Sequence, residues 1–386
     1  MKQVSELGNW VRVTLFYLLL VTIFGMLLRY TFVNPLGFVF QYFKHTHSHV
    51  AFLGWVFNGL FALIIYHYFA EITKTVKWQF YLFQVSVIGM LLSFPFQGYT
   101  SVSIAFSTLH IFISIWFYFS TLTKIKGNDI SIKWIKLGAF YMVISNIGPL
   151  SLGPIMASHL KDTFVYYLSL QHYLHFQYNG WFVVAIIGLL IKIFDLKPKN
   201  EKLLFWLLGW SVIPLFFVTI EIIESNPIYR IIGGAGAIAQ LLGVVILLKE
   251  IYPALIKHKL TYRIIFFVAS VCLLVKSLFQ VAVVFPSVSS MIIHSHNPVI
   301  GFLHLIFLGV ITNAVIAFFI KSGFIKLDST TLLGVILFNG GFILMDLLLF
   351  LQPFYTPNHY FHWLFYSTIP IFSGVLIYNI QGWKND

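Results

Sequence analysis

Charged residues are scarce in this sequence: Asp, Glu, Lys and Arg make up 9% of its 386 residues, whereas 59% are hydrophobic. The mean hydropathy is +0.88. Such a chain has too few polar side chains to cover a surface in contact with water, which excludes a soluble globular protein. No stretch between its apolar runs is long enough for a soluble domain. We therefore predict a single integral membrane domain over residues 1–386.

Cysteine is also nearly absent, because Cys272 is the only one. This excludes disulfides, a Cys-x-x-Cys-His haem attachment and thiolate metal centres. Any bound metal must then be held by nitrogen or oxygen. Methionine occurs only 7 times and forms no cluster, which argues against copper transport.

Long apolar runs recur along the whole chain. Each can cross ~30 Å of hydrocarbon as a helix of ~20 residues, and each is too long for a barrel strand of ~9–11 residues. The first run is too long for the core of a signal peptide, so we read it as a membrane span. The predicted fold is an all-α polytopic membrane protein with twelve transmembrane helices, at 10–32, 48–70, 78–96, 102–123, 133–157, 165–194, 203–223, 230–250, 263–286, 298–320, 330–351 and 358–380.

The net charge of +12 follows from membrane topology. With a cytoplasmic N-terminus, 19 of the 24 Lys and Arg residues fall in cytoplasmic segments, as the positive-inside rule requires. Both termini are then cytoplasmic, and the even number of spans agrees. The basic segments face anionic lipid of the inner leaflet. Membrane lipid is therefore the expected partner, and no nucleic acid is needed to explain the charge.

Three histidines recur at a nearly constant spacing, and each is followed five residues later by glycine. The segments are His49–Gly54, His175–Gly180 and His304–Gly309, with the histidines 126 and 129 residues apart. A constant period in a long apolar chain is typical of internal repeats. We predict a pseudo-threefold bundle of three four-helix units.

The predicted topology places 12 of the 14 histidines in the outer half of the membrane. Near the interface a hydrated, non-functional histidine is as good an interpretation as a ligand, and this holds for His159, His294, His296 and His359. An imidazole deeper in hydrocarbon needs a partner, which favours a ligand or a polar network. The deeper histidines are His49, His110, His175, His304 and His362.

Neutral imidazole binds haem iron, copper and zinc, and two histidines on facing helices can hold a porphyrin. The glycine five residues later lies on nearly the same helix face. It leaves room either for a flat macrocycle or for a closely packed neighbouring helix. Both interpretations stay open at this stage.

These features resemble subunit I of the haem-copper oxidase superfamily, which includes the cytochrome c and quinol oxidase polypeptides I, the cbb-type oxidases and the NnrS family. The most specific stretch is His47-Ser-His49-Val-Ala-Phe-Leu-Gly54-Trp55. The resemblance implies that His304 ligates a low-spin b-type haem, with His49 or His47 as its partner. We predict His49 first, because it lies deep and is followed five residues later by glycine, as His304 is, and His47 is the next candidate. It also implies that His175, with His172, lies where helix 6 supplies a copper ligand.

The sequence departs from that family at its oxygen-reducing centre. Phe302 stands where the oxidases carry the histidine that binds the high-spin haem, and residues 203–223 lack the histidine pair that completes the copper site. Instead, this helix ends in Glu221 and Glu224, which share a face. We favour a solvated helix end over a metal site or a proton-transfer role for these two residues. Oxygen reduction is therefore expected to be absent or very slow.

Four other histidines are candidates for a second metal site. His110 and His362 occupy matching places in the fourth helix of the first and third units, and with His172 and His175 they are predicted to form a metal cluster, with copper as its metal. Four separate, hydrogen-bonded core histidines are an equally good interpretation. Lys276 and Asp346 fall inside predicted spans, where ionisable residues are functional candidates, although a lysine can also reach back to the interface.

The expected function is thus haem binding on the outer side of a bacterial cytoplasmic membrane, in redox electron transfer or nitric-oxide-related chemistry, with a cytochrome or another redox protein as partner. One alternative is the catalytic subunit of a divergent terminal oxidase or nitric oxide reductase. The other is a transporter or assembly factor for metal or haem. The sequence leaves open whether the protein is an enzyme.

Overall fold

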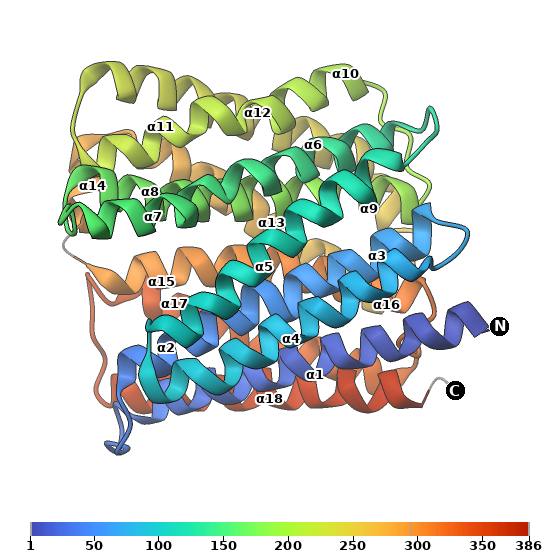
Figure 1. The fold of residues 1–386 in the computed structure, drawn as a ribbon, viewed down its shortest axis with the longest axis horizontal. Coiled ribbons are helices and arrows are strands. Elements are labelled where there is room, and N and C mark those ends of the chain that lie inside the picture. The colour runs from blue at the N-terminus through green and yellow to red at the C-terminus, as the bar shows by residue number, and fades with distance from the viewer. Residues whose placement is uncertain (1, 294, 385–386) are drawn as a thin grey trace.

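The computed structural model describes residues 2–293 and 295–384, so His294 lies outside the described residues. The described part contains helices and no strand. Twelve of these helical segments are long and apolar enough to cross a membrane, which confirms the predicted all-α polytopic fold. They form one bundle whose helices run along its long axis, with both termini at the same end (Figure 1). An even number of spans requires this arrangement of the termini.

The spans follow one another in three units of four. The first unit contains α1 (Lys2–Tyr30), a span made of α2 (Phe40–His49), η1 (Val50–Phe57) and α3 (Asn58–Tyr68), then α4 (Lys74–Gln97) and α5 (Ser101–Ser120), which ends in the short η2 (Leu122–Lys124). The second contains α6 (Ile130–Ser145) with α7 (Ile147–Ala157), then α8 (Phe164–His175) with η3 (Phe176–Phe182) and α9 (Val183–Ile193), then α10 (Glu201–Leu204) with η4 (Phe205–Trp210) and α11 (Val212–Ile223), and α12 (Pro227–Leu255).

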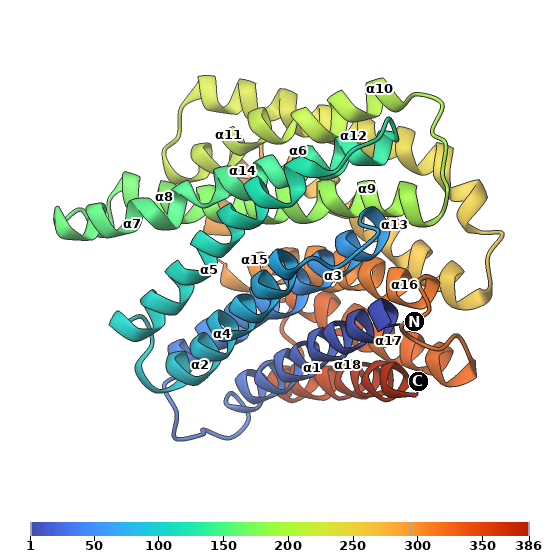
Figure 2. The ribbon, with the colours of Figure 1, turned by 45° about the vertical axis from the view of Figure 1, so that its right-hand side comes forward.

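The third unit begins with α13 (Leu260–Ala282) and a short connecting helix, α14 (Pro286–Ile293). It continues with α15 (His296–His304), η5 (Leu305–Thr312) and α16 (Asn313–Lys321), and it ends with α17 (Ser329–Leu351) and α18 (Tyr360–Trp383). The last helix packs along the first, so α1 and α18 lie side by side in both views (Figures 1 and 2). The Asn379 amide links them by donating to the Leu15 carbonyl at 3.0 Å.

The second span of each unit lies at the centre of the bundle. The most apolar window of each of these three spans is 83% buried, compared with 28–50% for the other nine. The halves of these spans nearer the termini, α3, α9 and α16, pack against one another. Aromatic rings of the preceding segments η1, η3 and η5 also meet, with Phe307 centred 4.4 Å from Phe52 and 6.1 Å from Phe182. The recurring histidines therefore lie on the three helices that the others surround.

A π-helical segment follows each recurring histidine directly. His49, His175 and His304 are the last residues of α2, α8 and α15, and η1, η3 and η5 begin at the next position. Segments with π geometry are rare and often occur at functional sites. A further π segment, η4, has no histidine before it. The same local structure at the same place in three units supports the internal repeat.

The recurring glycines serve helix packing. An added Cβ would lie 3.0 Å from the Tyr17 ring at Gly54, 2.6 Å from Tyr141 Cβ at Gly180, and 2.5 Å from Cys272 Sγ at Gly309. In each unit the neighbour comes from the first span, namely α1, α6 or α13. Small residues that let helices approach closely are common in membrane bundles. The contacts thus favour close helix packing over a macrocycle at these positions.

The second span begins earlier than predicted. The helix starts at Phe40, whereas the hydropathy pattern placed the start of the span at residue 48. The stretch between them is polar, so hydropathy cannot detect it, although its backbone is regular helix. As a consequence, His47 and His49 lie well inside a helix, about 10 Å or more from its first residue at 1.5 Å per residue.

Polar N-caps begin several spans on the side of the termini. The side chains of Thr73, Asp129 and Asp328 accept hydrogen bonds from the first backbone N–H groups of α4, α6 and α17. These groups have no partner within the helix, so a cap stabilises the helix start. The backbone N–H of Thr331 holds the pKa of Asp328 below its ordinary value.

We expect Asp328→Ala to lower the stability of the protein in detergent by about 1 kcal/mol at pH 7, the usual effect of losing a cap. Because the pKa of Asp328 is depressed in the folded protein, its contribution is present above the ordinary Asp value of about 4. It is lost as the pH falls through the folded pKa. Thermal unfolding from pH 7 to 3 measures this. Glu71→Ala, at an exposed carboxylate, is the control; an equal effect there would contradict the cap assignment.

Gly180→Ala is expected to destabilise the protein by about 1–3 kcal/mol, because the new methyl would overpack against Tyr141. The matched control is Gly340→Ala, since nothing lies within 4 Å of an added Cβ there. Thermal unfolding of both variants in the same detergent tests the difference. Equal unfolding temperatures would show that α6 and the central span are not packed as described.

Candidate functional site

The deep polar side chains form separate clusters between different sets of helices. We name three of them by one member: the Arg29 cluster (Arg29, His47, His304, Asp346 and Tyr360), the Lys276 cluster (His175, Asn179, Gln240, Lys276 and Gln280), and the Tyr99 cluster (His45, His49 and Tyr99). Within the described residues, no three His, Cys, Asp or Glu side chains are placed to hold one metal ion.

In the Arg29 cluster, His47 is oriented by a backbone carbonyl. Its Nδ1 donates to the carbonyl oxygen of Val21 in α1 at 3.0 Å. Gly25, one turn further along α1, leaves the space that the imidazole occupies, because an added Cβ would lie 3.3 Å from His47 Cε1. With the proton held at Nδ1, the lone pair of a neutral ring lies on Nε2. A metal-ligating histidine usually donates its other ring N–H to a carbonyl or carboxylate, as Nδ1 of His47 does here.

His304, at the end of α15, also has its Nδ1 turned toward an acceptor, in this case a carboxylate. Its Nδ1 lies 3.8 Å from Oδ1 of Asp346 in α17, which is longer than a hydrogen bond. Neither this nitrogen nor the two Asp346 oxygens has a hydrogen-bond partner among the described residues, although all three atoms are buried. The His304 side chain keeps 21% of its surface accessible, so the ring is not packed on all sides although its span is among the most buried.

Arg29 provides the positive charge of this cluster. It lies in the last turn of α1 and interacts electrostatically with Asp346, Tyr360, His304 and His47. Ionisable groups inside a membrane bundle are costly and commonly functional. A cation here can balance Asp346 and can also receive an anionic group of a ligand.

His49 makes a different set of contacts. Its Nδ1 donates to the His45 carbonyl at 2.9 Å, and the Tyr99 hydroxyl donates to its Nε2 at 3.0 Å. The ring also packs on Phe94, with centroids 4.5 Å apart. Both ring nitrogens are therefore occupied. The sequence predicted His49 first and His47 next as the partner of His304, whereas the contacts favour His47.

The four histidines of the predicted second cluster do not converge. His110 is buried between the rings of Phe57 and Phe83, at 4.8 Å from each, and its Nε2 has no partner among the described residues. His362 lies against His359 near the start of α18. Only His172 and His175 lie together, against the same ring of Phe216. The spacing predicted equivalent positions in the repeats, and equivalent positions do not face one another here.

Both nitrogens of His175 are engaged. Its Nε2 donates to the Val212 carbonyl at 2.8 Å, and the Asn179 amide donates to Nδ1 at 3.3 Å. In this arrangement no lone pair of the ring is available to copper. The contacts correspond to the hydrogen-bonded core histidine that the sequence analysis kept as an alternative.

Glu221 is part of a structural contact at the helix end. Its carboxylate accepts from Arg230 Nε at 3.1 Å, from Ser225 at 2.9 Å and from the backbone of Asn226 at 2.6 Å. The side chain is buried, so it is not the solvated helix end that we expected. It joins α11 to α12 through the loop between them.

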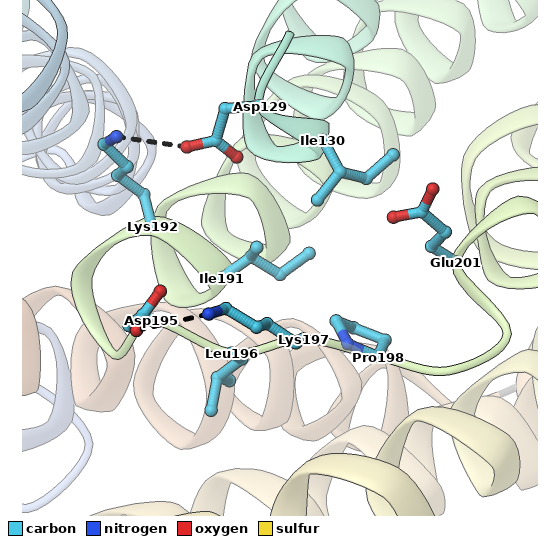
Figure 3. A pocket seen from close by; sticks show the side chains of 9 residues that line it. All are labelled: Asp129, Ile130, Ile191, Lys192, Asp195, Leu196, Lys197, Pro198 and Glu201. Atoms are coloured by element: carbon cyan, nitrogen blue, oxygen red, sulfur yellow. Dashed lines mark hydrogen bonds and ion pairs between the residues drawn. The ribbon is translucent and has the colours of Figure 1, made fainter.

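A pocket of about 350 Å³ lies at the opposite end from the deep histidines, where α6 begins and α9 ends (Figure 3). Its charges are mostly paired, with Lys192 3.0 Å from Asp129 and Lys197 4.0 Å from Asp195. Glu201 faces the same space. The pocket is therefore separate from the candidate haem ligands.

No protein-family model matches this chain, and no curated protein matches it. The sequence pattern predicted His47, His304 and Asp346 as candidates, whereas Arg29 was assigned only to the topology and its place in this cluster was not predicted. An arginine inside a predicted span, at 10–32, was the available signal.

Proposed function

We propose that this protein binds one b-type haem between His47 and His304 and transfers single electrons in a bacterial cytoplasmic membrane, as a divergent relative of haem-copper oxidase subunit I. The observation that carries the proposal is the matched orientation of the two rings. Each has Nδ1 turned toward an acceptor, Val21 O or Asp346 Oδ1, which leaves Nε2 as the free position. The two residues come from central spans of different units, and Arg29 acts electrostatically on both.

The residues of the Arg29 cluster fit the group chemically. Nδ1 of His304 and both oxygens of Asp346 are buried without a hydrogen-bond partner among the described residues, so the carboxylate is available to orient this ring through Nδ1 while Nε2 stays free for iron. When bound, haem with two histidine ligands supplies a one-electron redox couple. His47 and His304 would hold its iron, and Arg29 would pair with its carboxylates. Asp346 would orient His304 and strengthen it as a ligand.

Electron transfer is preferred over oxygen or nitric oxide reduction for two reasons. Phe302 cannot bind a second haem, and the nitrogens of His175 are already hydrogen-bonded. If His47 and His304 both held the iron, no site would remain on it for a gas. The bound haem would then exchange electrons with a cytochrome or another redox protein at the end of the bundle that carries His47 and His304.

The first test is spectroscopic. Purified protein from haem-replete cells should give a six-coordinate b-type reduced-minus-oxidised spectrum with one haem per chain. His47→Ala and His304→Ala should lose or convert that signal, because each removes an axial ligand. His49→Ala, two residues from His47, is the matched control and should keep it. Loss only in the His49 variant would move the ligand to His49. A preparation without haem would end the proposal.

Reduced protein should not bind carbon monoxide, because no axial position is open. A carbon monoxide spectrum identical to that of the reduced protein is the expected result. His304→Gly is the positive control, since it opens one axial position. A shifted spectrum in the unaltered protein would show an open haem site and would favour the oxidase or reductase alternative.

Asp346→Asn should raise the reduction potential of the haem. In its ionised form, Asp346 would place a negative charge beside the ligand, which favours the oxidised, more positive form, so removing the carboxylate disfavours oxidation. The expected shift is on the order of 60 mV, a tenfold change in a one-electron equilibrium. Potentiometric titration measures it, with Asp129→Asn at the opposite end of the bundle as control. An unchanged potential in Asp346→Asn would show that this carboxylate does not act on the haem.

A further inference from the structure

Lys276 is one of the most deeply buried side chains of the bundle, at 1% exposure, and it lies inside α13. It does not reach back to the interface, as a lysine near the end of a span can do. Its only hydrogen-bond partner among the described residues is the amide oxygen of Gln240 in α12, at 3.5 Å. An ammonium group has three N–H donors, so most of its hydrogen-bonding capacity is unused.

No carboxylate of the described residues lies within ion-pair distance of Lys276. The two buried carboxylates of the described residues have other partners: Glu221 pairs with Arg230, and Asp346 interacts with Arg29 and His304. A buried charge without a counter-charge is strongly destabilising. The protein must therefore either keep this amine neutral or provide an anion from outside.

The surroundings of Lys276 are polar and carry no negative charge. Gln240 uses its amide nitrogen to donate to the Leu208 carbonyl at 3.0 Å and to Ser211 at 3.1 Å, which turns its oxygen toward Lys276. Gln280, one turn after Lys276 on the same face of α13, donates weakly to Asn179 at 3.5 Å. The Gln280 oxygen is buried and has no partner among the described residues.

We propose that the Lys276 cluster binds one small inorganic anion, such as chloride, that neutralises the lysine. The ammonium of Lys276 has unused N–H donors and no internal counter-charge, and the Gln280 amide nitrogen, one helical turn away, uses one of its two N–H groups on Asn179 and keeps the other for a ligand. A halide accepts N–H donors from an ammonium and from carboxamides without needing a fixed geometry. All five side chains of the cluster are at most 7% exposed, which limits the ligand to a few atoms.

This site is independent of the proposed haem. It lies among α8, η3, α12 and α13, whereas the Arg29 cluster lies among α1, α2, α15, α17 and α18. The nearest histidine in the network is His175, which reaches it through Asn179. Anion binding would therefore stabilise the packing of the second unit against the start of the third, whether or not haem is present.

The experiment compares chloride with gluconate, which is too large for the site, at equal ionic strength. Full-length protein in nanodiscs should unfold at a higher temperature in chloride, and the increase should saturate with concentration, as linkage to one binding site requires. Equilibrium dialysis with radiolabelled chloride should give one tightly held ion per chain. No saturable shift and no bound chloride would overturn the proposal.

Two variants identify the site. Lys276→Met should remove both bound chloride and the chloride-dependent shift, whereas Lys161→Met, at an exposed lysine, should keep them. If the Met variant does not fold, Gln280→Glu gives the same information. It places a carboxylate one turn from Lys276, so the folded variant should lose its dependence on chloride. Chloride binding that persists in Gln280→Glu or in a folded Lys276→Met would place the ion elsewhere and contradict the assignment.

Discussion

The absence of water inside a membrane bundle is the constraint on which this structure depends. Each buried polar group must find its partner within the protein, because lipid offers none. Some of these pairs link different spans: Asn379 with the Leu15 carbonyl joins the last span to the first, and His47 with the Val21 carbonyl joins the second to the first. Among the described residues, the Asp346 oxygens have no hydrogen-bond partner and Lys276 has one at 3.5 Å, and both proposed ligands are placed beside these two groups.

The two halves of each central span differ in composition and packing. Toward the termini, α3, α9 and α16 are apolar and pack closely, which gives the bundle a rigid interior. Toward the other end, the same three spans carry the histidines, each with different neighbours. Because the repeat supplies three equivalent positions, the neighbours decide their roles: the positions of His49 and His175 are closed by hydrogen bonds, and that of His304 is not.

Much of the fold could be predicted from the sequence, because hydropathy and a fixed period report how far along a helix a residue lies. The twelve spans, the buried Lys276 and Asp346, and the recurring glycines were found in this way. The direction in which a side chain points around its helix was not available. The proposed cluster of His110 and His362 with two others failed to converge for that reason, and the choice between His47 and His49 needed the contacts of α1.

The π-helical segments after the histidines have a geometrical consequence for how this bundle could have evolved. An α-helix turns by about 100° per residue. One additional residue in a wider turn therefore rotates the side chains that precede the turn, about the helix axis, relative to those that follow it. In η1, η3 and η5 this break lies between the histidine and the closely packed half nearer the termini. The aim of each histidine can therefore change by the gain or loss of one residue, while the packing of α3, α9 and α16 stays the same. The wider turn therefore allows the direction of a histidine side chain to change in evolution without a change in the helix packing that stabilises the bundle.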